Sequence, residues 1–118
     1  MNQIELAKEI DELYQSIKKP ITRDPHGLMD ELSYRCEWLA RSAEIEADAQ
    51  YHLDRRRGEV CDLFDEENWN SLKIKIESET AQERKLLALA DRLNATLTHQ
   101  IDAIRSILSF EKQSRANQ

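Results

Sequence analysis

The sequence predicts an all-α protein in which a short N-terminal helix is followed by two long antiparallel helices. Two observations lead to this fold class. The 118 residues include only 2 glycines and 2 prolines, so there is little material for turns and the elements must be few and long. Apolar residues also recur every three or four positions along most of the chain, which is the period of an amphipathic helix. At this length we expect a single helical domain over residues 1–118.

The first helix is predicted from about residue 4 to residue 18. Lys18 and Lys19 suit the negative end of its dipole, and Pro20 ends it, so residues 20–24 are a short linker. One face of this helix is apolar, with spacings of four, three and four, and is formed by Leu6, Ile10, Leu13 and Ile17.

The second helix is predicted over about residues 25–64. Asp24 can accept bonds from free backbone N–H groups, and Pro25 at the first helical position loses no bond. Gly58, directly after three arginines, is an alternative stop signal. We favour continuation to Phe64, because Leu63 and Phe64 still match the apolar stripe and one internal glycine costs only about 1 kcal/mol.

The third helix is predicted over about residues 69–113, after a reversal at residues 65–68. It carries the most regular apolar stripe in the chain. Thr80 and Glu83 match a capping box, so a break near residues 78–80 is an open alternative.

The two long helices would be about 60 and 65 Å long, which is too long for a globule of this size. We therefore expect self-association into an oligomeric helical bundle or barrel, with Asn94 as a polar group that sets the register. The candidate oligomer interface is the stripe of the third helix: Leu86, Leu93, Leu97, Ile101, Ile104 and Leu108.

Several function classes lack their sequence features. No apolar run approaches the roughly 20 residues that span a bilayer, and no secretory signal is present, so a cytoplasmic protein is expected. Cys36 and Cys61 have no ligand-spaced neighbours and are expected to be reduced and half-buried. Phosphate loops, nucleophile elbows and Cys-x-x-Cys are missing, so we expect no catalytic residues, no cofactor, no small-molecule substrate and no enzyme activity.

Three residues with metal-ligand chemistry, Glu44, Asp48 and His52, share one helical face. Spread along a single helix they span about 12 Å, which is too far to share one ion. A solvated helix face is the favoured interpretation, and no metal site is predicted.

Basic residues suggest a nucleic-acid strip, although the net charge is −6 and the middle of the chain is acidic. If the long helices form a hairpin, basic groups on both face each other near its tip, where Tyr51 or Trp69 could stack on bases. The candidate residues are Arg55, Arg56, Arg57, Lys73, Lys75, Arg84 and Lys85. The alternative is that Asp54, Glu59, Glu77 and Glu79 neutralise them.

Three stretches, Tyr34–Leu39, Leu53–Arg57 and Asp102–Glu111, resemble phage and prophage recombination mediators of the UvsY type. The resemblance implies an oligomeric barrel of helices in a bacterial host cell, single-stranded DNA binding by basic side chains, and contacts with a recombinase and a single-strand-binding protein. This chain is more acidic than that pattern.

Two functions follow as hypotheses. The first is an accessory protein of DNA recombination or replication that acts as an oligomer on single-stranded DNA, a recombinase, or both. The second is a non-enzymatic helical scaffold or adaptor that acts through protein–protein contacts without nucleic acid.

Overall fold

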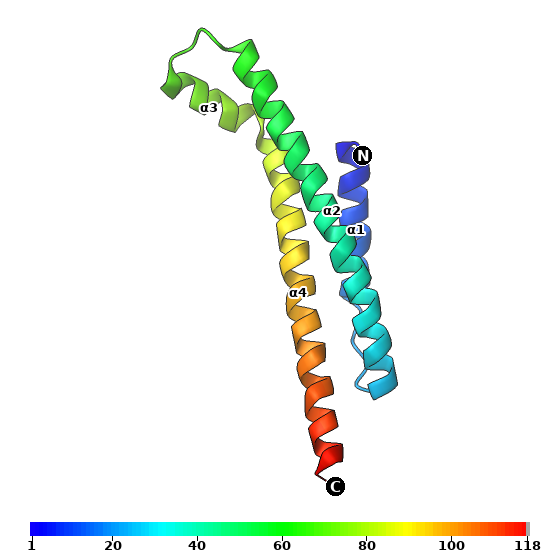
Figure 1. Ribbon diagram of the computed structural model, residues 1–118. Helices are drawn as coiled ribbons and strands as arrows, with labels where there is room; N and C mark the ends of the chain where they lie inside the picture. Colours follow the sequence, from blue (N-terminus) through cyan, green and yellow to red (C-terminus); the bar gives the residue numbers. More distant parts are fainter. Residues whose placement is uncertain (118) are drawn as a thin grey trace.

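The computed structural model describes residues 1–117 as a rod with principal extents of 74 × 25 × 17 Å (Figure 1). Its Cα radius of gyration is 20.0 Å, whereas a compact chain of this length would have about 13 Å. The predicted domain ends at Gln118, which lies outside the described residues. Every regular element of residues 1–117 is a helix, which confirms the all-α prediction: α1 (Gln3–Ile17), α2 (Pro25–Leu63), α3 (Trp69–Glu79) and α4 (Ala81–Ala116).

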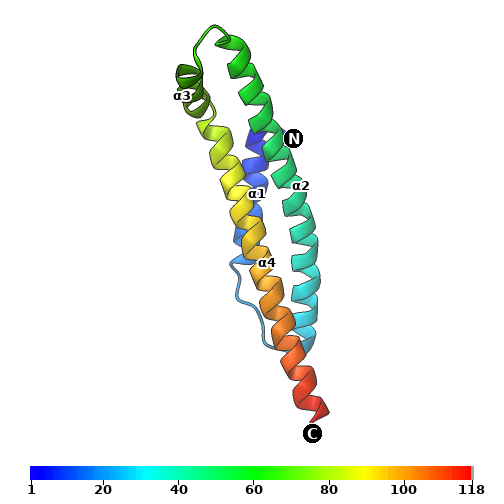
Figure 2. The ribbon, with the colours of Figure 1, turned by 60° about the vertical axis from the view of Figure 1, so that its left-hand side comes forward.

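The two long helices α2 and α4 run antiparallel and form the shaft of the rod (Figure 1). The shorter α1 lies alongside the middle of this pair and runs opposite to α2. At one end of the rod, α3 turns away from the shaft; we call this end, formed by residues 62–79, the tip. Figure 2 shows α1 behind the shaft, next to both long helices.

The N-termini of α1 and α2 are fixed by side-chain caps. Asn2 Oδ1 accepts a bond from the Glu5 backbone N–H at 2.8 Å, and the Glu5 carboxylate accepts from the Asn2 N–H at 3.4 Å, which is a capping box. The Asp24 carboxylate accepts from the Gly27 N–H at 3.0 Å, and Pro25 follows at the first helical position. The start predicted for the second helix is therefore confirmed.

Gly58 does not end α2, which continues to Leu63 as the favoured interpretation of the sequence has it. This glycine has a negative φ, and no atom of the protein lies within 4 Å of where its Cβ would be. It is simply an exposed position on an uninterrupted helix.

Thr80 separates α3 from α4, so the alternative with a break is the one observed and a continuous helix over residues 69–113 is wrong. The break is not the predicted capping box, because the Thr80 side chain makes no cap bond. Its buried hydroxyl instead donates to the Ile76 carbonyl oxygen at 2.6 Å. Glu83 turns toward α1, where its carboxylate accepts from the Gln3 amide at 3.4 Å.

The hydrophobic core lies in the middle of the rod, where three helices meet. Side chains of α1 fill the groove between α2 and α4, and the central part of the cluster is formed by Leu6, Ile10, Ile17, Ile45, Ala49, Leu86, Ala90, Leu93 and Leu97. Beyond the reach of α1, α2 and α4 continue to pack against each other, with buried Leu28 and Ile104 toward one end and Val60 toward the other.

The candidate oligomer interface is already part of this packing. Five of the six residues, Leu86, Leu93, Leu97, Ile101 and Ile104, are buried within one chain, and Leu108 is half-buried. Asn94 donates to the Glu46 carboxylate on α2 at 3.1 Å, so it pairs the two long helices of the same chain. The expectation that a second chain is needed to cover this stripe is corrected by the position of α1 and α2.

A buried arginine connects all three helices at one level. Arg35 on α2 is only 1% exposed; its Nε donates to Gln100 Oε1 on α4 at 2.8 Å, and its guanidinium pairs with Glu31. Gln100 in turn donates to the Ile17 carbonyl oxygen at the end of α1, at 3.1 Å. The Trp38 ring lies below the guanidinium, 5.4 Å from its carbon to the ring centroid. This chain of contacts fixes the axial register of the bundle.

Two carboxylates face each other across the α2–α4 contact. Burial raises the pKa of Glu46, and the neighbouring Asp91 raises it further by a hydrogen bond and by its negative charge, while the Asn94 amide acts in the opposite direction. The folded state therefore binds a proton at Glu46 more readily than the unfolded chain does.

Replacing a core leucine should cost far more than replacing an exposed one. Leu97→Ala removes a fully buried side chain, so we expect the free energy of unfolding to fall by about 2–5 kcal/mol. The matched control Leu63→Ala changes an exposed leucine and should stay within about 0.5 kcal/mol. Urea unfolding followed by circular dichroism measures both, and equal losses would contradict the described core.

Glu46→Gln should stabilise the protein at neutral pH. Because the folded pKa of Glu46 is raised, its penalty is present at pH 7 and disappears as the pH falls toward the unfolded value of about 4.3. The variant should thus have a higher urea midpoint than wild type at pH 7 and an equal one at pH 4. Glu37→Gln, at an exposed position on α2, is the control and should leave the urea midpoint at pH 7 close to that of the wild type. If the stabilisation by Glu46→Gln instead increased as the pH is lowered, the raised pKa of Glu46 would be contradicted.

Candidate protein-interaction site

The tip is built by two breaks in the helical chain. α2 ends at Leu63, and after a short loop Asn68 caps α3 by accepting from the Ser71 N–H at 2.9 Å. Thr80 then ends α3 and redirects the chain into α4. The chain therefore projects an 11-residue helix from the end of the shaft (Figure 1).

Polar contacts hold α3 against α2. Arg56 on α2 donates to the Glu79 carboxylate at 3.1 Å and to the Glu79 carbonyl oxygen at 3.4 Å. Lys75 on α3 pairs with Glu67 at 2.7 Å, and its ammonium lies 4.1 Å from the centroid of the Phe64 ring. No residue of α3 is fully buried. The helix is thus attached through its edges and adds little to the hydrophobic core.

Three large apolar side chains lie open at the tip, and we call them the tip surface: Leu63, Trp69 and Ile74 are 68%, 69% and 67% exposed. They come from the end of α2 and from two positions of α3. Exposed apolar residues scattered singly are ordinary on protein surfaces, whereas larger apolar patches mark interaction sites. Trp69 and Ile74 are five residues apart on α3 and point about 140° from each other, so the three side chains lie around the tip and not on one flat face.

The charged residues around the tip surface are mostly acidic. Asp62, Asp65, Glu66 and Glu67 surround the turn, and only Glu67 makes an ion pair among residues 1–117. The local field therefore favours cationic groups.

The arginines predicted to bind nucleic acid are paired with carboxylates. Arg55 pairs with Glu59 at 3.3 Å, Arg57 with Asp54 at 3.7 Å, and Arg56 with both Glu59 and Glu79. The structure thus has the pairing by Asp54, Glu59 and Glu79 that the sequence offered as the alternative, whereas Glu77 contributes only its carbonyl oxygen.

The other predicted basic residues do not join the arginines in a strip. Arg84 donates to the Glu77 carbonyl oxygen and to Thr80 Oγ1, and Lys75 is paired as described above. Lys73 and Lys85 are exposed, and neither makes an ion pair within the described part of the chain, but they lie on different helices, α3 and α4. Tyr51 is exposed on α2 and its ring packs edge-on against His52.

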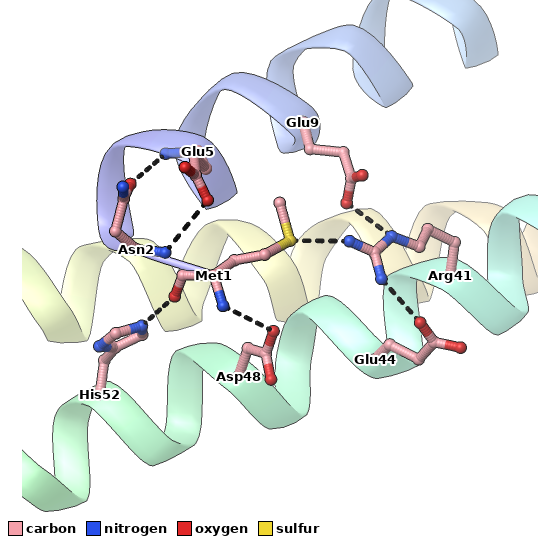
Figure 3. A network of polar contacts seen from close by, with 8 residues as sticks. All are labelled: Met1, Asn2, Glu5, Glu9, Arg41, Glu44, Asp48 and His52. Carbon is pink, nitrogen blue, oxygen red and sulfur yellow. Dashed lines mark hydrogen bonds and ion pairs between the residues drawn. The ribbon is translucent and has the colours of Figure 1, made fainter.

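The acidic face of α2 receives the N-terminal segment, as Figure 3 shows. Arg41 Nε donates to the Glu9 carboxylate of α1 at 2.7 Å, and its Nη1 donates to Glu44 at 2.6 Å. These bonds to Glu9 and then Glu44 raise the pKa of Arg41, which stays charged. His52 Nε2 lies 2.6 Å from the Met1 carbonyl oxygen, and Asp48 lies 3.9 Å from the Met1 amino group.

Asp48 and His52 thus contact Met1 of the N-terminal segment, which the sequence interpretation as a solvated face missed, whereas Glu44 is exposed and, within the described part of the chain, pairs only with Arg41 of its own helix. The sequence does contain Glu9, the partner of Arg41, but only the docking of α1 on α2 brings the two residues opposite each other. No group of three or more histidine, cysteine or acidic side chains in residues 1–117 is arranged to hold a metal ion.

Two further expectations meet the structure here. Cys36 is exposed rather than half-buried, Cys61 is half-buried, and both thiols are free. None of the described helices is both long and apolar enough to cross a membrane.

Comparisons with protein-family models, with curated proteins and with solved structures give no significant match to this chain. The resemblance to UvsY-type mediators therefore remains a prediction from the sequence, and function has to be inferred from the molecule's own surfaces.

Removing the Arg56–Glu79 pair should loosen α3 without affecting the shaft. An ion pair at this exposure contributes up to about 1 kcal/mol, so Arg56→Ala should speed hydrogen exchange of the α3 amides by about twofold to fivefold. Arg55→Ala is the matched control, because Arg55 pairs only with Glu59 within α2. If α3 amides of the wild type exchange as slowly as those of central α4, the described attachment is wrong.

Proposed function

We propose that this chain is a non-enzymatic helical adaptor that uses the tip surface to bind a basic, amphipathic segment of a partner protein. The observation that carries the proposal is the coincidence, at one end of a rigid rod, of three exposed apolar side chains and an acidic turn.

The apolar part of the tip surface would supply the affinity. Trp69 and Ile74 project from a helix that is fixed at both ends, so little conformational entropy is lost when a partner covers them. Aromatic side chains at the centre of an interface commonly contribute the largest share of binding free energy. Trp69 is therefore the residue on which binding should depend most.

The acidic part would select the partner. Asp62, Asp65 and Glu66 have no cation to pair with among the described residues, and a lysine- or arginine-rich segment would provide one. Opposite charges across an interface raise the association rate and disfavour acidic partners. An amphipathic helix with one apolar and one basic face matches both requirements.

Single-stranded DNA is the second candidate ligand, and one observation favours it. Trp69 and Lys73 are both exposed on α3, so a base could stack on the indole while the lysine contacts a phosphate. The acidic turn beside them opposes phosphate, and the three arginines are already paired. We therefore place DNA second.

One titration compares the two candidates. A dye-labelled amphipathic peptide of lysine and leucine, about 18 residues or five helical turns long, is the probe, with a glutamate–leucine peptide of the same pattern and an oligo-dT as alternatives. We expect binding of the lysine peptide only, weakened by added salt. The double variant Trp69→Ser, Ile74→Ser should lose at least about tenfold in affinity.

The matched control changes exposed aromatic residues near the other end of the rod, Tyr34→Ser with Phe110→Ser, and should bind like wild type. Equal loss in both double variants, or no binding of the lysine peptide, would reject the adaptor proposal. Salt-sensitive binding of oligo-dT that is lost in Lys73→Ala would instead support the DNA candidate.

A further inference from the structure

A second groove lies on the face of the shaft that α1 does not cover. It has a volume of about 340 Å³ and runs between α2 and α4, lined mainly by small and apolar side chains. Thr98 on its wall is two residues, or about 200° of helical rotation, from Thr96, which lines the groove beside α1. The groove is therefore on the opposite side of the α2–α4 pair.

The floor and walls of this groove are suited to a helix. Leu39 and Ile101 form its apolar floor. Ala40 and Ala43 on α2 have small side chains, so another backbone can approach closely. The chain also exposes 8195 Å² in total, whereas a compact monomer of its mass would expose about 6,600 Å². The surplus exceeds the roughly 800 Å² that each partner buries in a standard interface.

The charges at the rim indicate which molecule fits. Asp102 and Arg105 line the groove one helical turn apart, have opposite signs, and make no ion pair in residues 1–117. In an antiparallel contact between two copies of α4, a two-fold axis between these positions places each Asp102 against the other copy's Arg105. A two-fold interface must be complementary to itself in this way.

We propose that this groove is a homodimer interface, in which each copy lays its α4 along the groove of the other and two Asp102–Arg105 pairs form across the axis. Apart from Ile101, which belongs to both, the surface differs from the stripe that the sequence suggested, because most of that stripe is buried by α1 and α2. The two-fold axis lies across the rod, so the two tips point to opposite ends of the dimer. The inference does not rest on the adaptor proposal.

Four proteins test this geometry: the wild type, two single variants with one charge reversed, and the double variant with both charges reversed. Sedimentation should give the wild type twice the 13.8 kDa chain mass at micromolar concentration. Asp102→Arg and Arg105→Asp each place like charges across the axis and should weaken the dimer by at least about tenfold. Mixing the two single variants should restore a dimer, since every cross-axis pair is then opposite in charge. The double variant in one chain should dimerise like wild type.

Cys36 provides an independent measure of where the interface lies. It lines the groove and is exposed, so its alkylation rate should fall as the wild type dimerises, while the half-buried Cys61 serves as internal control. Circular dichroism checks that each variant keeps its helicity. A monomeric wild type, single variants that still dimerise, a mixture that stays monomeric, or a Cys36 rate that ignores concentration would each overturn the proposal.

Discussion

The fold depends on a mismatch in length between its helices. α1 has 15 residues, while α2 and α4 have 39 and 36, so a helix about 22 Å long has to cover a shaft about two and a half times its length. It covers the middle, and there the core is a true three-helix bundle. Beyond α1 the shaft consists of α2 and α4 alone, and several large apolar side chains remain exposed toward its ends, among them Leu63, Trp69 and Phe110. The candidate site therefore lies at the end of the shaft that α1 does not reach.

Polar contacts then determine the position at which α1 docks. Arg35, Gln100 and the Ile17 carbonyl group connect the three helices at one level, and Arg41 with Glu9 connects α1 to α2 nearer the tip. A buried arginine is stabilising only when its partners are in place, and sliding α4 past α2 by one turn would separate Arg35 from Gln100 and leave it only Glu31 of its own helix. Hydrophobic burial drives the three helices together, and these contacts select one register among several of similar apolar area.

The sequence predicts the local structure well, because helix starts and periods depend on near neighbours. Asp24 with Pro25 and the three-and-four stripe are readable without knowing what lies across the bundle. What could not be predicted depends on tertiary placement. That α1 would bury Leu93 and Leu97, leaving no stripe for another chain, requires knowing where α1 docks. Thr80 matched a capping box, yet its backbone is not extended like that of a usual N-cap residue, and its hydroxyl turns back to donate to the Ile76 carbonyl oxygen of α3. The pairing of Arg56 with Glu79 depends on the fold-back of α3, which the break at Thr80 creates.

Since α3 contributes no buried residue, its sequence is under little constraint from folding. Asn68 and Thr80 mark its limits, and the shaft is stabilised elsewhere. Substitutions on the outward side of this helix can therefore accumulate without loss of stability, and each new combination would present a different recognition surface on an unchanged support. Such a separation lets specificity diverge quickly among descendants of one ancestral chain, and it makes the segment between Asn68 and Thr80 a natural place to graft a foreign helical epitope.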